Sequence, residues 1–106
     1  MKSSFIQMFT TTHTTKLAEK IAKVLVEKKL AACVQIVGPA KSIYRWQGKV
    51  EQAKECLCFI KTTQSHFQKV EQVIKELHPY EIPEIISVAI LNGNKDYLNW
   101  LSESVR

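Results

Sequence analysis

No apolar run in this sequence approaches the ~20 residues that a membrane-spanning helix needs. The first residues also lack the apolar segment of about 7–15 residues and the small-residue cleavage site of a secretory signal. We therefore expect no membrane association, a mature chain that begins as written, and a cytoplasmic location.

Cysteine is scarce, with three residues, and an odd number without a secretory signal argues against a disulfide framework. Clustered positive charge is also missing, although the net charge is +5. The 15 basic residues are diluted by 10 acidic ones, and the longest basic run is the pair Lys28-Lys29. Because electrostatic binding of nucleic acid needs basic charge gathered on one face, we expect no nucleic-acid partner.

Glycine and proline are few, with three of each, and no repeat or low-complexity segment divides the chain. At 106 residues the length is below that of a typical domain. The apolar fraction of 45% is ordinary and suffices for one core. We predict a single domain spanning residues 1–106.

The first half of the chain alternates between strand and helix patterns. Residues 4–10 are a nearly continuous apolar run, which is typical of a buried strand. Threonines then offer N-caps for a helix over 16–30, whose apolar residues form one stripe at helical spacing. Residues 31–37 predict a second strand that breaks at Gly38-Pro39, and extended structure resumes at 42–46.

The second half begins with a return arm. Gln47-Gly48 can form a tight turn, and residues 53–63 predict a third strand. Ser65 and Gln68 have the spacing of a capping box that would start a second amphipathic helix. Pro79 ends that helix, because proline disfavours helical geometry at the residue before it.

A fourth strand over 84–90 and a helix over 95–105, capped by Asn94, complete the pattern. The order β-α-β-β-α-β predicts an α+β, ferredoxin-like sandwich with an added C-terminal helix. The hairpin between the second and third strands, at about 41–62, is long for this chain. Because exposed strand edges are usually covered or paired, the hairpin indicates either assembly with two- or three-fold symmetry or a tip that folds back at Gly38-Pro39, and we favour assembly.

Five segments follow one another in an order and spacing that resemble the CutA family of divalent-cation tolerance proteins. They are "LAACVQI" at 30–36, "SIYRWQGKV" at 42–50, "ECLCFIKTT" at 55–63, "HPYEIPE" at 78–84 and "YLNWL" at 97–101. The resemblance implies a ferredoxin-like subunit in a homotrimer with intersubunit clefts. It also implies a cytoplasmic role in the response to heavy metals such as copper, with no established catalytic reaction, so we expect no enzyme activity.

The resemblance also implies a site. A ligand cleft between subunits would use the family-matching positions Cys33, Tyr44, Trp46, Glu55, Lys61, Tyr80 and Trp100. Copper ligands proposed in the family are a cysteine at the end of the first strand and two histidines before Pro-Tyr. Those positions here hold Phe9, Leu77 and His78, so His78 is the one remaining ligand. We expect weak binding of copper or another divalent cation, and no required cofactor.

Two cysteines allow a second interpretation. Cys56 and Cys58 lie two residues apart on a predicted strand, so both thiols point to one face and could hold a soft ion such as Cu(I). Ile60 shares that face, however, and free cysteine is among the most buried residue types. We favour packing in the core. His78, similarly, can serve as a polar residue at the end of a helix.

Two other classes of protein compete with the CutA interpretation. RNA-recognition modules share this strand order, but their third strand carries stacking aromatics and glycine, whereas "ECLCFIKTT" has one aromatic and no glycine. The alternative is an uncharacterised enzyme or small-anion sensor that uses Lys61, Glu55 and Tyr80 in one cleft. The structural interpretation of Lys61 and Glu55 is an ordinary ion pair.

Overall fold

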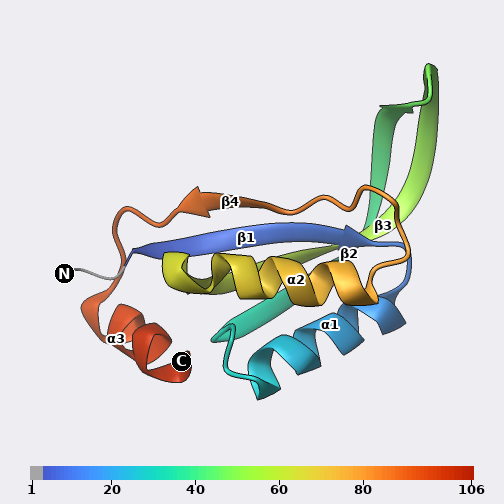
Figure 1. Cartoon of the computed structure of the whole chain (residues 1–106). Coiled ribbons are helices and arrows are strands. Elements are labelled where there is room, and N and C mark those ends of the chain that lie inside the picture. The colour runs from blue at the N-terminus through green and yellow to red at the C-terminus, as the bar shows by residue number, and fades with distance from the viewer. Residues whose placement is uncertain (1–3) are drawn as a thin grey trace.

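All four strands belong to one antiparallel sheet in the order β2-β3-β1-β4 (Figure 1). This computed structural model describes residues 4–106. The elements are β1 (Phe5–Thr12), α1 (Thr15–Glu27), β2 (Cys33–Trp46), β3 (Lys49–Thr63), a 3-10 turn (Gln64–His66), α2 (Phe67–Leu77), β4 (Ile86–Ala89) and α3 (Lys95–Ser104). The order confirms the predicted ferredoxin-like arrangement with a C-terminal helix.

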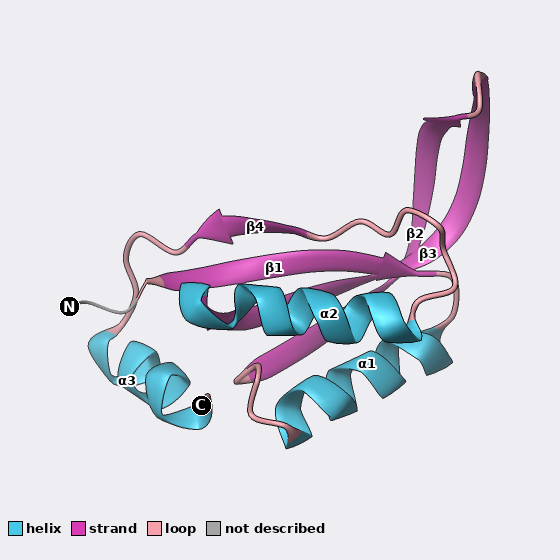
Figure 2. Cartoon of the chain, in the orientation of Figure 1, coloured by secondary structure: helices cyan, strands magenta, loops and turns pink. Residues whose placement is uncertain are grey.

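Helices α1 and α2 cover the same face of the sheet (Figure 2). Helix α1 begins where the threonine-rich segment predicted it, because the Thr14 side chain accepts a hydrogen bond from the backbone N–H of Leu17. Its apolar stripe buries Ala18, Ile21 and Leu25 against the sheet. The helical spacing of these residues therefore determines which side of α1 meets the core.

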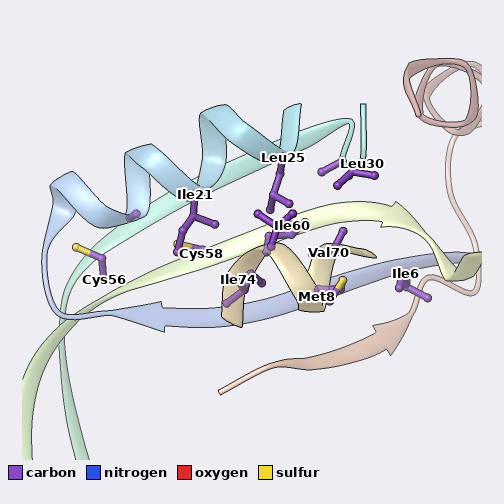
Figure 3. Close-up of a cluster of buried hydrophobic side chains, with 13 residues drawn as sticks. Ile6, Met8, Ile21, Leu25, Leu30, Cys56, Cys58, Ile60, Val70 and Ile74 are labelled. Carbon is purple, nitrogen blue, oxygen red and sulfur yellow. The ribbon is translucent and has the colours of Figure 1, made fainter. Parts of the chain in front are cut away.

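The core lies between the two helices and alternate residues of the central strands (Figure 3). Met8 of β1 and Cys58 and Ile60 of β3 are fully buried there. The predicted packing of Cys56 and Cys58 in the core is thus confirmed. The apolar run of β1 suggested a strand buried on both faces. Instead, burial alternates along most of the strand, and Phe9 is only partly buried on the other face.

Strand β2 is continuous, and the predicted break at Gly38-Pro39 is wrong. The pairing with β3 shifts by one residue between Val37 and Ala40, which is a β-bulge. Proline has no N–H to give to the strand ladder, so a bulge accommodates it without a lost hydrogen bond. A Cβ at Gly38 would lie 3.2 Å from the Cα of Cys56, so the close approach of the two strands favours glycine.

The two long strands form a hairpin that extends beyond the rest of the sheet (Figure 1). The predicted turn is confirmed: Gln47 and Gly48 both have positive φ, at 50° and 80°. Strand β3 starts at Lys49 rather than at residue 53, because pairing continues up to the turn. The hairpin is therefore longer than the predicted span of 41–62.

The start of α2 also differs from the prediction. The turn Gln64–His66 precedes the helix, and the Ser65 hydroxyl interacts with Thr63 and His66 rather than forming a capping box with Gln68. Strand β4 is shorter than 84–90, with four residues. The predicted cap of α3 is confirmed, since the Asn94 side chain accepts a hydrogen bond from the backbone N–H of Tyr97.

The face of the sheet opposite α1 and α2 carries apolar side chains, and we call it the open face. Its apolar members, assigned from strand register and alternation, are Phe9, Val37, Leu57, Phe59, Ile86 and Val88. The rings of Phe9 and Phe59 meet edge to face with centroids 5.4 Å apart. None of the helices in the described part of the chain has the length and apolarity needed to cross a membrane.

Candidate functional site

A pocket of about 580 Å³ lies where the hairpin meets the segment after α2, and we call it the hairpin-base pocket. Its volume is within the roughly 300–1,000 Å³ usual for small-molecule sites. It is lined by Thr11, Ser42, Ile43, Tyr44, Trp46, Glu55, Tyr80, Glu81, Ile82 and Glu84. Within residues 4–106, no lysine, arginine or histidine lines this pocket. Its walls therefore combine aromatic rings with carboxylates.

A chain of hydrogen bonds holds one wall of the pocket. The Tyr80 hydroxyl donates to Glu55 Oε2 at 3.0 Å, and the Tyr80 backbone N–H donates to His78 Nδ1 at 3.2 Å. His78 Nε2 lies 2.6 Å from the carbonyl oxygen of Thr11. These bonds connect the end of β1, the segment after α2 and the middle of β3. The "HPYEIPE" segment thus positions a site as well as ending a helix.

The bonding of His78 identifies its tautomer. Nδ1 accepts a backbone N–H, so the ring proton resides on Nε2 and is donated to the Thr11 carbonyl. His78 is buried, and both of its nitrogens are engaged. A metal ion could reach either nitrogen only after one of these bonds broke.

The residues of one chain do not form the copper site that the family resemblance implies. Within the described residues 4–106, no group of three or more His, Cys, Asp or Glu side chains is placed to hold a metal ion. Phe9, at the position of the family's cysteine, lies on the open face and has no donor atom. Metal binding through His78 remains a prediction.

Tyr80 keeps its proton under ordinary conditions. Burial, then the hydrogen bond and charge of Glu55 and the nearby Tyr44, raise the pKa of Tyr80 to about 12. The phenol therefore acts as a hydrogen-bond donor to the carboxylate and is not suited to remove a proton from a ligand near neutral pH.

The predicted cleft residues fall into two groups within one chain. Tyr44, Trp46, Glu55 and Tyr80 line the hairpin-base pocket. Cys33, Lys61 and Trp100 do not, and Cys33 instead pairs with Lys61 between β2 and β3. A single chain thus does not unite all seven residues in one cleft.

Lys61 lies outside the hairpin-base pocket because it is too far from Glu55 along β3. Glu55 and Lys61 share one face of β3 but are six residues apart, which is about 20 Å along a strand. Lys61 Nζ donates instead to the Gln35 side-chain oxygen on the neighbouring strand. The expected Lys61–Glu55 ion pair is absent among residues 4–106, where the one ion pair joins Lys75 and Glu71.

The second group lies beside α3. The rings of Tyr97 and Trp100 are 5.4 Å apart, and both are exposed in the single chain. Burial and the neighbouring Cys33 raise the pKa of Tyr97. This region contains an exposed pair of aromatic rings near Cys33, and neither ring lines the hairpin-base pocket.

Sequence reasoning missed several lining residues of the pocket. They are Thr11, Ser42, Ile43, Glu81, Ile82 and Glu84. Glu81 and Glu84 belong to the "HPYEIPE" segment, so their proximity to Tyr80 was the available signal. Thr11 lies on β1 and Ser42 on the hairpin arm of β2, and no local sequence pattern reveals that the fold brings both beside this segment.

The buried thiols give a prediction for the folded protein. Burial, with a smaller contribution from Cys56, raises the pKa of Cys58 from 9.0 to about 11. Because the thiolate is the reactive form, Cys58 is expected to react slowly with a thiol reagent. Cys56 is also expected to react slowly, because it is buried in the same core cluster and the reagent cannot reach it. At a given pH below 9.0, Cys58 should label much faster in the denatured chain than in the folded chain, because the raised pKa lowers its thiolate fraction in the folded state. Mass spectrometry of labelled peptides measures this, and rapid native labelling of both thiols would contradict the core assignment.

Together these features define a class: a ferredoxin-like α+β protein with a projecting hairpin, a pocket at its base and an apolar open face. The model of the CutA1 divalent ion tolerance protein family matches residues 6–104. The chain therefore belongs to this family, as the sequence motifs predicted.

Relatives cover most of the chain. The divalent-cation tolerance protein CutA of Thermus thermophilus is 51% identical over 89 residues, which are 84% of this chain and 86% of that protein. Protein CutA of Mus musculus is 40% identical over 95 residues, or 90% of this chain, but this covers only 54% of the mouse protein.

Solved structures share the fold. The structure of the Thermus thermophilus divalent cation tolerance protein matches with a TM-score of 0.94 at 45% identity, over 96% of this chain and 99% of that chain. The structure of the periplasmic divalent cation tolerance protein CutA of Archaeoglobus fulgidus matches with a TM-score of 0.91 at 41% identity, over 99% of this chain and 100% of that chain.

Proposed function

We propose that this CutA-family protein acts as a cytoplasmic homotrimer in the response to divalent metals such as copper, and that it binds a small ligand without catalysing a reaction. The observation that carries the proposal is the open face. Val37, Ile86 and Val88 are each about half exposed in the single chain, and Phe9 and Phe59 lie among them. A contiguous apolar surface of this kind favours burial against another protein surface.

The hairpin supports the same assembly. Ile43 and Val50 expose 63% and 64% of their surface near its tip, where one chain alone cannot cover them. A long hairpin also presents strand edges that natural proteins pair or shield. Association of three copies would cover these apolar residues and place the hairpin-base pocket next to a neighbouring subunit.

The assembly is tested by light scattering after size exclusion. We expect a particle three times the 12.2 kDa mass of the chain at micromolar protein concentration. Because association stabilises the folded state by mass action, the melting temperature should rise with protein concentration. A monomer mass at micromolar concentration would overturn the proposal.

Metal binding is expected to be weak. A tight copper site needs several converging donors supported by outer hydrogen bonds, whereas the family's positions provide only His78 in this chain. Calorimetric titration with copper should show weak binding that disappears in His78→Ala. His66→Ala, which changes an imidazole bonded to Thr63 at the other end of α2, is the control. Tight binding that survives His78→Ala would place the metal elsewhere.

A further inference from the structure

We propose that Cys56 and Cys58 form a metal site inside a single subunit, which binds one soft univalent ion such as Cu(I) between the two thiolates. The proposal goes beyond the function proposed above and is independent of the assembly, because both side chains belong to the core between the sheet and its helices. Three observations support it: the pairing of the thiols, the start of α1 beside Cys56, and an unsatisfied hydroxyl opposite Cys58.

The two thiols are neighbours on the core face of β3 (Figure 3). Residues two apart on a strand are separated by about 6–7 Å, and their side chains leave the strand on the same side. Two metal–thiolate bonds of about 2.3 Å each, the length that zinc forms, span the remaining gap once the sulfurs turn toward each other. Both cysteines can therefore reach one ion from an unchanged strand.

The number and type of donors select the kind of ion. Thiolates prefer soft ions such as Cu(I), and a soft univalent ion is satisfied by two sulfur ligands. Zinc sites in proteins use three or four protein ligands, and hard divalent cations need more oxygen donors than that. Within residues 4–106, no group of three or more His, Cys, Asp or Glu side chains is placed to hold a metal ion. The pair thus suits a soft univalent ion rather than a divalent one.

The start of α1 compensates the charge of such a site. Two thiolates and one univalent ion carry a net negative charge, which is costly in a core unless nearby donors or positive charge stabilise it. The hydroxyl oxygen of Thr15, the first residue of α1, lies 3.4 Å from Cys56 Sγ. The N-terminal end of a helix carries a partial positive charge that favours anions. A thiolate at Cys56 would accept the Thr15 hydroxyl and face this end of α1.

An unsatisfied hydroxyl lies opposite Cys58. Thr10 of β1 is the cross-strand partner of Cys58 and is only 1% exposed. Among residues 4–106, its Oγ1 is the one buried side-chain nitrogen or oxygen without a hydrogen-bond partner. A buried hydroxyl without an acceptor is unfavourable, and a thiolate at Cys58 would accept its hydrogen bond. Thr10 therefore supplies an outer donor of the kind that supports metal ligands.

The test is a competition for Cu(I) under anaerobic, reducing conditions. The protein is mixed with the coloured Cu(I) complex of bathocuproine disulfonate, and loss of colour measures the transfer of the ion to the protein. The signal is followed until it is constant, because both thiols are buried and loading is expected to be slow. We expect one Cu(I) per chain, with X-ray absorption showing two sulfur ligands. Ag(I), another soft univalent ion, should displace it.

Matched variants assign the ion to the two thiols. Cys56→Ser should weaken Cu(I) binding at least about 100-fold, because one of two soft donors is lost. Cys33→Ser, which changes the remaining free cysteine, should leave the affinity unchanged. His78→Ala should also leave it unchanged, since that imidazole belongs to the separate metal binding proposed above.

Thr10→Val distinguishes an ion site from an ordinary core. Valine resembles threonine in shape but lacks the hydroxyl, so the variant removes an unpartnered polar atom. We expect the ion-free variant to be at least as stable as the wild type in denaturant titration, while its Cu(I) binding weakens about 3-fold to 10-fold. Because this change should not disturb folding, it keeps the test valid if Cys56→Ser fails to fold.

The outcomes separate this proposal from the proposed function. Cu(I) binding to the wild type that is no tighter than binding to Cys56→Ser would overturn the site, as would equal losses in Cys56→Ser and Cys33→Ser. An unchanged affinity in Thr10→Val would overturn the part assigned to that hydroxyl. Binding that is lost in His78→Ala but kept in Cys56→Ser would overturn the thiol site and support the imidazole instead.

Discussion

Replacing Phe59 with glutamate is expected to convert the proposed trimer to single chains at micromolar concentration. Phe59 lies on the open face beside Phe9, so in the assembly the new carboxylate would be buried without a partner. The desolvation penalty of a buried ion is several kcal/mol, and a trimer contains it three times. Light scattering measures the mass, and circular dichroism verifies that the chain remains folded.

The matched control for this variant is Val26→Glu. Val26 is an exposed apolar residue of α1, and α1 covers the opposite face of the sheet (Figure 2). Its substitution should leave both the mass and its concentration dependence unchanged. If Phe59→Glu retains the mass of three chains, the open face is not the contact surface.

Replacing Leu25 with alanine is expected to have the largest effect on stability. Leu25 is 0% exposed and packs in the core with Ile60 and Val70, so truncation removes buried contacts and leaves a cavity. Such changes lower the free energy of unfolding by about 2–5 kcal/mol. Denaturant titration at one fixed protein concentration measures the difference, since association would otherwise contribute to it.

The neighbouring residue provides the comparison. Val26→Ala removes apolar atoms from a side chain that is 43% exposed. Its effect on the free energy of unfolding should stay within about 0.5 kcal/mol. Equal losses for the two variants would mean that the apolar stripe of α1 does not face the core as described.

Signals carried by residues close together in the sequence predicted most of the helices, strands and turns. The helical stripe of α1, the turn at Gln47-Gly48 and the side-chain cap at Asn94 all depend on residues close together in the chain. Cys56 and Cys58 were placed in the core for the same reason, since strand alternation determines their face. Local rules suffice where the cause is local.

The site was harder to predict, because its parts come from separate segments. Sharing a strand face with Glu55 suggested that Lys61 lies near it, but alternation defines a face and says nothing of distance along it. Gly38-Pro39 favours a break and a bulge equally, and only the pairing with β3 distinguishes them. The engagement of both nitrogens of His78 depends on Thr11, 67 residues away in sequence.

The bulge in β2 has a consequence for how the pocket can change. It lies between Val37 and Ala40, before the arm that carries Tyr44 and Trp46, and bulges bend the strand that contains them. The hairpin turns away from the sheet beyond this region (Figure 1). None of the residues at the bulge lines the pocket. The bulge residue Ala40 pairs with Glu55, which lines the pocket. Substitutions at the bulge could therefore change the opening of the pocket, and with it the ligand preference, while every lining side chain stays the same.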